Sequence, residues 1–305
     1  MSFSHDISDY PDGIVLAVDK PYRWTSADVI RKLKYAAIKH FGKKNLKVGH
    51  AGTLDPLATG VLLVCIGNAC KRAQELQDHD KEYIARIRFG ATTPSYDLEK
   101  EVDRTFPFEH ITADAVRAAL PSFLGEQEQV APLFSAKSVD GVRAYELARK
   151  LYRSGQTSAI DAAALETLHR NRIVISELEL LDFVPEGIHS PESVPTLGHV
   201  RGRGPEPARS AGAWEGSRSD DSGECIPSGK NASSRIHVTD TSGMGLPEAV
   251  IRIACSKGTY IRAFARDLGE ALGSGAHLSG LIRSRSGSFG LSDSLSVDQA
   301  LALLQ

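Results

Sequence analysis

A 63-residue segment rich in glycine, proline and serine limits how much of this 305-residue chain folds as one body. Between residues 185 and 247 these three types fill 27 positions, whereas Ile, Leu and Val together fill only 8. Such a composition buries too little apolar surface to offset the entropy lost on ordering, so it predicts a disordered insertion. An Ω-loop or lid with its own function is the alternative. The other 242 residues suit one domain, so we expect a single domain over 1–305, interrupted at 185–247.

Composition and cysteine spacing exclude several classes of protein. The longest uninterrupted apolar run, residues 61–66, is far shorter than the roughly 20 residues that a membrane-spanning helix needs. The four cysteines include no C-x-x-C pair, so neither a zinc ribbon nor a disulfide framework is expected. The first residues have no basic or apolar region typical of a signal peptide. We therefore expect a cytoplasmic protein with no membrane contact.

The charge is unevenly distributed along the chain. The formal net charge is only -2, but residues 20–47 hold nine Lys or Arg and a single acid, Asp28. A basic stripe of this density is a candidate phosphate-binding face. A solvated helix face is the alternative, and charge alone does not separate the two.

The expected elements mix strands and helices without a regular βαβ alternation. Strands are expected at 13–18, 61–66, 82–89, 172–183 and 249–255, and helices after Thr25 or Ser26, over 112–120, over 142–151 and over 261–272. In the strand at 82–89, Tyr83, Ala85, Ile87 and Phe89 fall on one face, with Arg86 and Arg88 on the other. This pattern favours an α+β fold with a mixed, mostly antiparallel sheet flanked by helices.

Two segments carry residues suited to chemistry. Residues 48–60 contain three Gly, one Pro and two Thr, which specify a fixed loop, and Pro56 biases Asp55 away from the helical region. Asp55 and His50 are candidates for catalysis there, although an Asx turn and a turn hydrogen bond are the alternatives. Residues 255–269 read as a strand end, a glycine turn and a helix whose first turns carry Tyr260 and Arg262, a candidate anion site.

Taken together, these segments resemble the TruB family of tRNA pseudouridine-55 synthases. The three hallmarks occur in order: Asp19-Lys20-Pro21 with Thr25-Ser26, then Gly49-His50-Ala51-Gly52-Thr53-Leu54-Asp55-Pro56-Leu57-Ala58-Thr59-Gly60, then Ser256-Lys257-Gly258-Thr259-Tyr260-Ile261-Arg262. Asp80-Lys81-Glu82-Tyr83, Asp97 and Gly275-Ala276-His277-Leu278, leading to Leu281 and Arg283, extend the match. The resemblance covers residues 13–305 apart from the insertion, and it implies the pseudouridine synthase catalytic fold.

The resemblance also implies roles for single residues. Asp55 matches the catalytic carboxylate, and Arg262 matches its basic partner. Tyr83 matches the aromatic residue that stacks on the target base, while Tyr260 and Leu281 match residues that line the uracil pocket. His50 matches the residue that contacts the flipped nucleotide.

Other matches concern the surroundings of that site. Lys20 and Pro21 match a motif that supports the active-site loop, and Asp97 matches a residue associated with the RNA-binding cleft. The usual Arg-Arg pair after the pocket leucine is Ile282-Arg283 here, which puts one phosphate or packing contact in doubt.

The implied reaction converts uridine 55 in the T-arm of tRNA to pseudouridine. It breaks the N1–C1′ bond, rotates the uracil and joins C5 to C1′, so it requires neither a metal nor a cofactor. One carboxylate suffices, either as a nucleophile at C1′ or as a base at C2′. Only residues 290–305 follow the last motif, too few for the C-terminal PUA domain of many relatives. We therefore expect a monomer that binds the T-arm stem-loop and has no obligate protein partner.

Overall fold

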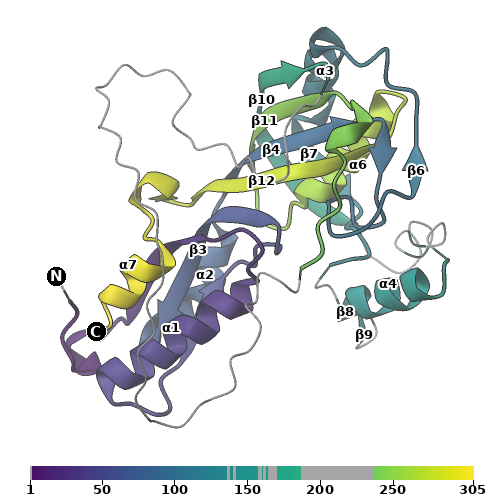
Figure 1. The fold of residues 1–305 in the computed structure, drawn as a ribbon. Coiled ribbons are helices and arrows are strands. Elements are labelled where there is room, and N and C mark those ends of the chain that lie inside the picture. The colour runs from purple at the N-terminus through teal and green to yellow at the C-terminus, as the bar shows by residue number, and fades with distance from the viewer. Residues whose placement is uncertain are drawn as a thin grey trace, which may run out of the picture.

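A computed structural model of the chain describes residues 2–135, 138–139, 142–156, 160, 163, 170–186 and 236–305. Within these residues, nine strands form one large mixed sheet whose main path runs β1-β3-β12-β4-β11-β10-β7. Every neighbouring pair on this path is antiparallel except β3 and β12, which are parallel. Figure 1 shows β12 crossing the middle of the molecule, between the part that holds α1 and β3 and the part that holds β11 and α6.

The strands of the large sheet are β1 (Ile14–Lys20), β2 (Val48–Ala51), β3 (Ala58–Ile66), β4 (Lys81–Phe89), β7 (Gly125–Gln129), β10 (Asn171–Val184), β11 (Glu248–Cys255), β12 (Ala276–Ser286) and β13 (Phe289–Gly290). Two small hairpins pair β5 (Ala91–Thr92) with β6 (Arg104–Thr105) and β8 (Ser138–Val139) with β9 (Val142–Arg143). The helices are α1 (Ser26–Phe41), α2 (Ala73–Asp78), α3 (Ala113–Ala119), α4 (Ala144–Arg153), α6 (Ile261–Ala271) and α7 (Val297–Ala302). The expected α+β arrangement around a mostly antiparallel sheet is confirmed.

Capping residues in the sequence set both ends of helix α1. Thr25 is the N-cap and forms a capping box with Asp28, because the Thr25 hydroxyl accepts from the Asp28 amide while the Asp28 carboxylate accepts from the Thr25 amide. Gly42 ends the helix in the left-handed conformation, with φ of 60°. Between these caps, Val29, Leu33 and Ala37 form the buried stripe that packs on the sheet.

Strand β3 is buried on both faces, as its apolar run predicts. Leu62, Val64 and Ile66 belong to the main hydrophobic core, which includes α1, α6 and α7. Leu63 and Cys65 point to the opposite side, where a second cluster forms with the residues before and within α2. This double burial fixes β3 rigidly, and the loop that precedes it inherits that rigidity.

Some boundaries differ from the sequence-based expectation. The helix expected over 142–151 begins only at Ala144, because residues 142 and 143 belong to strand β9. Residues 187–235, most of the expected insertion, lie outside the described residues. Residues 236–247, the end of the expected insertion, pack on the body, with Thr239, Thr241 and Leu246 all buried. Among the described residues, none of the helices has the length and apolar character needed to cross a bilayer.

Candidate active site

Asp55 lies in the loop between β2 and β3, and two buried side chains, Ser26 and Lys20, hold this loop. The Ser26 hydroxyl donates to the Leu54 carbonyl at 3.1 Å and accepts from the Leu54 amide at 2.9 Å. The Lys20 ammonium donates to the Pro56 carbonyl at 3.2 Å and to the Trp24 carbonyl at 2.6 Å. These bonds hold the backbone on both sides of Asp55, so the position from which its side chain extends is fixed.

Lys20 is fully buried beneath this loop. Burial lowers the pKa of its ammonium from 10.5 to about 7, although the nearby Asp55 carboxylate opposes the shift. Lys20 belongs to the basic stripe that the sequence offered as a phosphate-binding face, and its burial removes it from that face. Its contacts instead place it beneath the active-site loop, where the family resemblance puts it.

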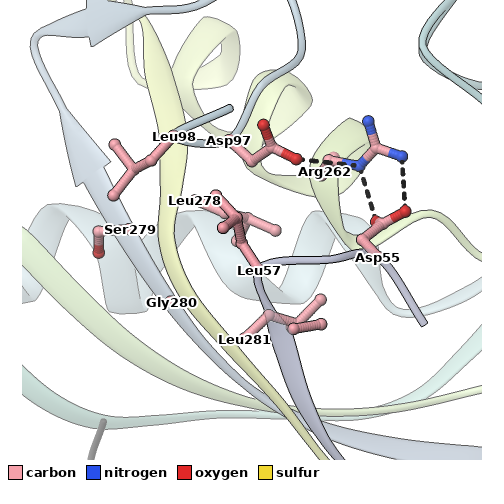
Figure 2. A pocket seen from close by; sticks show the side chains of 10 residues that line it. Asp55, Leu57, Asp97, Leu98, Arg262, Leu278, Ser279, Gly280 and Leu281 are labelled. Atoms are coloured by element: carbon pink, nitrogen blue, oxygen red, sulfur yellow. Dashed lines mark hydrogen bonds and ion pairs between the residues drawn. The ribbon is translucent and has the colours of Figure 1, made fainter. Parts of the chain in front are cut away.

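Arg262 holds Asp55 in a two-point ion pair (Figure 2). Its Nε donates to Asp55 Oδ2 at 2.9 Å, and its Nη2 donates to Asp55 Oδ1 at 3.1 Å. The Arg262 side chain is only 6% exposed, whereas that of Asp55 is 37% exposed. A bidentate pair fixes the orientation of a carboxylate as well as its charge. The Asp55 carboxylate is therefore held in one orientation while part of it remains accessible to solvent.

Further acceptors surround the same guanidinium. Its Nη1 donates to the Ser95 carbonyl at 3.2 Å, and Asp97 Oδ2 lies 3.8 Å from its Nε. Burial alone lowers the pKa of Arg262, but the carboxylates of Asp55, Asp97 and Glu99 outweigh it and leave the pKa raised. Arg262 is therefore a permanent cation. Asp97 is itself buried, and it lies beside Arg262 at the pocket.

Two acids in this cluster are shifted toward their neutral forms. Burial, followed by the repulsion from Asp55, raises the pKa of Asp97 against the pull of Arg262. Burial, followed by the repulsion from Asp97, raises the pKa of Glu99 to about 7. Arg262 is thus the shared cation for three carboxylates, and the pKa values of Asp97 and Glu99 are the ones that rise.

An apolar pocket opens beside Asp55 (Figure 2). Leu57, Leu98, Leu278 and Leu281 line it together with Ala58, Asp97, Arg262, Ser279 and Gly280. Its free volume is about 20 Å³, which is space for little more than one water molecule. Strand β12 supplies four of the lining residues through a register shift between Leu278 and Gly280, and such a bulge turns side chains to a new direction.

The other residues expected at the site lie around Asp55 at different depths. Leu281 lines the pocket as expected, but Tyr260 is absent from its lining. Tyr260 precedes α6 as its N-cap and packs on the cluster around Val130 and Leu133. Its hydroxyl lies within electrostatic range of Asp55, and burial raises its pKa.

Tyr83 and His50 complete the expected set. Tyr83 is a buried residue of β4, and burial raises the pKa of its hydroxyl while Arg283 donates a hydrogen bond to it. His50 lies on β2, where burial and then Arg283 lower its pKa, and its Nδ1 is buried without a hydrogen-bond partner. Arg283 is buried and donates to the carbonyls of Val61 and Gly52. It therefore acts inside the protein and offers no surface for phosphate.

A second charged cluster abuts the pocket wall, and the sequence analysis did not identify it. Glu248 Oε1 accepts from Arg86 Nε at 2.7 Å, and its Oε2 accepts from Arg88 Nε at 2.9 Å and from the Ser279 hydroxyl at 2.6 Å. All three charged residues are buried. Alternation along β4 did place Arg86 and Arg88 on one face, but only the sheet register brings Glu248 opposite Arg88.

The described part of the chain contains no group of three or more His, Cys, Asp or Glu residues arranged to hold a metal ion. What the arrangement offers chemically is one oriented carboxylate, a buried cation behind it and an apolar pocket with aromatic residues close by.

Comparison with known proteins adds an independent line of observation. Residues 38–185 match the family model described as TruB family pseudouridylate synthase, N-terminal domain. A tRNA pseudouridine synthase B from Phocaeicola vulgatus is 44% identical over 95% of this chain and 92% of its own length. The Flavobacterium johnsoniae protein of the same name is 35% identical over 95% of both chains, and that of Thermus thermophilus is 39% identical over 90% of this chain and 73% of its own.

Solved structures with the same fold are more distant in sequence. A Cbf5-Nop10-Gar1 complex contains a chain that superposes with a TM-score of 0.53 at 22% identity, over 96% of this chain and 56% of that one. An H/ACA RNP bound to a substrate RNA containing 2′-deoxyuridine gives a TM-score of 0.52 at 18% identity, over 99% of this chain and 57% of that one. These matches establish the fold, and this chain spans little more than half of each matched chain.

Proposed function

This chain belongs to the TruB family of pseudouridylate synthases, and from that premise we propose that it isomerises uridine 55 in the T-arm of tRNA to pseudouridine. Relatives that it matches over more than nine-tenths of their length are named tRNA pseudouridine synthase B, which supports tRNA as the substrate. The assignment of position 55 and of the catalytic group rests on the motifs of the sequence and on the site that they form.

One observation carries the proposal: an oriented carboxylate stands at the edge of an apolar pocket. Asp55 is held at two points by the buried Arg262, and Leu57, Leu98, Leu278 and Leu281 line the space beside it. A flipped uracil needs an apolar pocket because it has left the base stack. The carboxylate at the pocket edge is then placed to reach the ribose.

Asp55 supplies the chemistry by one of two routes. As a nucleophile it attacks C1′, the N1–C1′ bond breaks, and uracil leaves with the bonding electrons. As a base it removes the C2′ proton and gives a glycal together with the free uracil. In both routes the uracil rotates before C5 bonds to C1′. In the first route this attack breaks the bond between C1′ and Asp55 and frees the carboxylate, and in the second Asp55 returns its proton to C2′. The C5 proton is then lost and N1 gains one, so the atoms balance.

The neighbouring residues have supporting roles in this proposal. Tyr83 presents an aromatic ring in the buried region next to Asp55, where it stacks on the base, and its raised hydroxyl pKa keeps the phenol neutral. Leu281 packs against the base from the pocket floor. His50 contacts the displaced nucleotide, and its lowered pKa keeps the imidazole neutral there. Tyr260 lies outside the pocket lining, at the N-cap of α6 and two residues before Arg262.

The RNA backbone requires a basic surface, and part of the basic stripe provides one. The exposed lysines 34, 44 and 47 line an open hollow with Asn45, Leu46, Val48, Gly49 and Cys70, and this lining includes no acid. The hollow adjoins β2 next to His50. We assign phosphate contacts to these lysines, in place of the buried Lys20, Arg262 and Arg283.

The test is direct incubation of the protein with unmodified tRNA, followed by carbodiimide labelling and primer extension. We expect pseudouridine at position 55. Asp55→Asn should bind the tRNA nearly as well as the wild type but turn over at least 10²-fold more slowly, because the carboxylate acts on the nucleoside and not on phosphates. Pseudouridine formation by this variant above about one per cent of the wild-type rate would refute the role of Asp55. A wild-type protein that binds tRNA without modifying it would instead be an RNA-binding module.

A further inference from the structure

The pocket beside Asp55 is narrow, with a free volume of about 20 Å³. How a base fits against Asp55 therefore depends on where the walls of this pocket stand. The walls differ in how they are supported.

Three walls are anchored in the core of the fold. Leu57 and Ala58 follow the braced Asp55 loop and lead into β3, which is buried on both faces. Leu278 and Leu281 lie on β12, the strand between β3 and β4 in the sheet. Moving any of these would break strand pairs or the main core.

The fourth wall, Leu98, lies outside the large sheet. It belongs to the connection between β5 and β6, which pair only with each other. The same connection carries Ser95, whose carbonyl accepts from Arg262, and Asp97, so its position also affects the cluster behind Asp55. What holds this connection from outside therefore determines the shape of the pocket.

Residues 236–241, which we call the strap, provide that outer support. The Thr239 amide donates to the Leu98 carbonyl at 2.8 Å, directly behind the pocket wall. His237 Nε2 lies 2.7 Å from Glu101 Oε1, which ties the strap to the same connection three residues later. The Thr241 hydroxyl accepts from Arg88 at 2.7 Å, which joins the strap to the Glu248 cluster.

The strap is also tied to the opposite side of the site. Arg23 Nη2 donates to the Ile236 carbonyl at 2.7 Å, so the strap spans from the turn before α1 to the connection that holds Leu98. Arg23 has a left-handed backbone, with φ of 62°, which is costly for a residue with a side chain. Such strain persists where the surrounding structure enforces it, and here it accompanies the contact with the strap.

We propose that the strap positions the Leu98 wall and so fixes how firmly the flipped base is held against Asp55. Thr239, His237 and Arg23 are its positioning residues, and none of them touches the base. This inference rests on the proposed function. It assigns a role in the base pocket to the end of the segment that the sequence presents only as an insertion.

The test compares variants that release the strap with a matched control. Arg23→Ala removes the tie to Ile236, and His237→Ala removes the tie to Glu101. Arg117→Ala is the control, because Arg117 is an exposed arginine on α3 that pairs locally with Asp114 and lies outside the basic stripe. Arg23→Lys keeps a donor for the Ile236 carbonyl. Each variant is assayed for single-turnover rate and for KM with one T-arm RNA, for thermal midpoint, and for hydrogen exchange of the Thr239 amide.

We expect Arg23→Ala and His237→Ala to lower the single-turnover rate about 10-fold, with KM changed less than 3-fold and the thermal midpoint nearly unchanged. The Thr239 amide should exchange faster in both. Arg23→Lys should recover most of the rate, and Arg117→Ala should match the wild type. Wild-type rates in both release variants, with faster Thr239 exchange, would overturn the inference. A raised KM at an unchanged rate would also overturn it, because Arg23 would then be an RNA contact. If the wild-type protein forms no pseudouridine, the proposed function is wrong. If only the variants behave like the wild type, the role of the strap is wrong, so the two outcomes can be told apart.

Discussion

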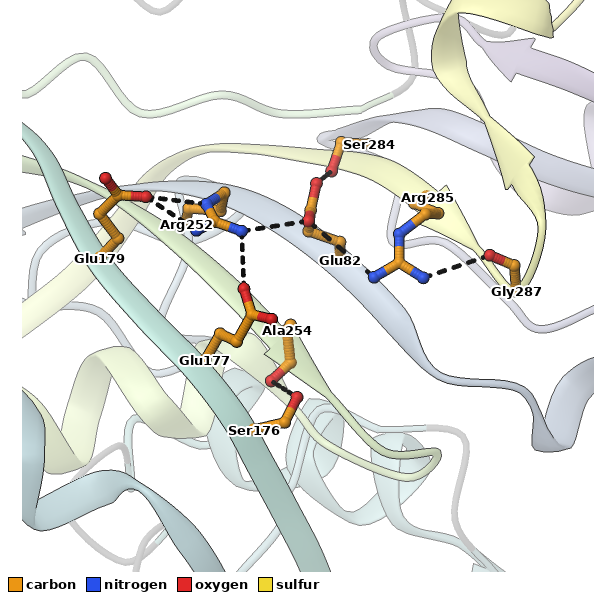
Figure 3. A network of polar contacts seen from close by, with 9 residues as sticks. All are labelled: Glu82, Ser176, Glu177, Glu179, Arg252, Ala254, Ser284, Arg285 and Gly287. Atoms are coloured by element: carbon orange, nitrogen blue, oxygen red, sulfur yellow. Dashed lines mark hydrogen bonds and ion pairs between the residues drawn. The ribbon is translucent and has the colours of Figure 1, made fainter.

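Two arginines of this protein each meet three carboxylates, and they differ mainly in their surroundings. Arg262 is buried at the base pocket among Asp55, Asp97 and Glu99. Arg252 lies on β11 at the surface and meets Glu179 at 2.8 Å, Glu177 at 2.9 Å and Glu82 at 3.5 Å (Figure 3). Its side chain is 32% exposed, and that of Glu179 is 54% exposed.

The comparison shows that the number of ion pairs around an arginine does not indicate how much they contribute to stability or to the geometry of the pocket. Water screens the charges around Arg252, so each pair there adds little to stability. Arg262 is buried, and there burial, together with repulsion between the carboxylates, raises the pKa values of Asp97 and Glu99. The ion pair with Arg262 fixes the Asp55 carboxylate at the pocket. The four predictions below test this contrast.

Arg262→Gln should have the largest effect. It removes both hydrogen bonds to Asp55 and leaves Asp97 buried without its cation, which typically costs about 3–5 kcal/mol. We also expect turnover to fall at least 10²-fold, because Asp55 loses its fixed orientation. Urea unfolding and single-turnover assays on tRNA measure the two effects separately. If the variant kept wild-type stability and turnover, the buried ion pairs of Arg262 would contribute no more than exposed ones.

Glu248→Gln should be the next most damaging change. Arg86 and Arg88 would stay buried opposite a neutral amide, at a cost of about 3 kcal/mol in unfolding free energy. Ser279 would lose its charged acceptor in the pocket wall, so turnover should fall as well. Glu179→Gln is the matched control, since its partner Arg252 is at the surface. Equal losses from the two variants would contradict the contrast between buried and exposed pairs.

The sequence predicted the parts of this site that depend on local patterns. The loop at 48–60, the apolar run of β3 and the capped start of α1 all follow from residues close together in the chain. The Asp55 and Arg262 pairing came from the family resemblance, since 207 residues separate the two. The Glu248 cluster and the strap depend on register and on contacts across the sheet, for which the sequence contains no local signal.

One part of the basic stripe differs from both readings of its charge. Lys20 belongs to the stripe that the sequence offers as a phosphate-binding face or a solvated helix face, yet it is a buried donor to backbone carbonyls. Whether a cation faces water depends on packing, and packing is not visible in the local sequence.

Glu99→Gln should change the pH dependence of stability. Burial raises the pKa of Glu99 from 4.5 to about 7, so between these values the folded protein holds a proton that the unfolded chain releases. The stability from this group is complete below pH 4.5 and is lost as pH rises through 7. Glutamine stays neutral, so relative to the wild type the variant should gain on the order of 2 kcal/mol between pH 5 and 8. Urea unfolding at several pH values measures this gain, and parallel wild-type and variant curves would contradict the shifted pKa.

Arg252→Gln should have the smallest effect, and its comparison with Arg262→Gln isolates burial because the substitution is the same. A second cation shares one of the three pairs, because Arg285 Nη2 lies 4.0 Å from Glu82 Oε2, the same oxygen that Arg252 contacts at 3.5 Å. Removing Arg252 leaves Glu82, Glu177 and Glu179 close together, but each is at least partly open to water and can turn away. We therefore expect a loss of about 1 kcal/mol or less, with turnover unchanged. Because surface pairs are screened, the loss should shrink further as salt is raised from 0.05 to about 0.5 M. A loss above about 2 kcal/mol that salt does not reduce would mean that this surface network is held as rigidly as the one around Arg262.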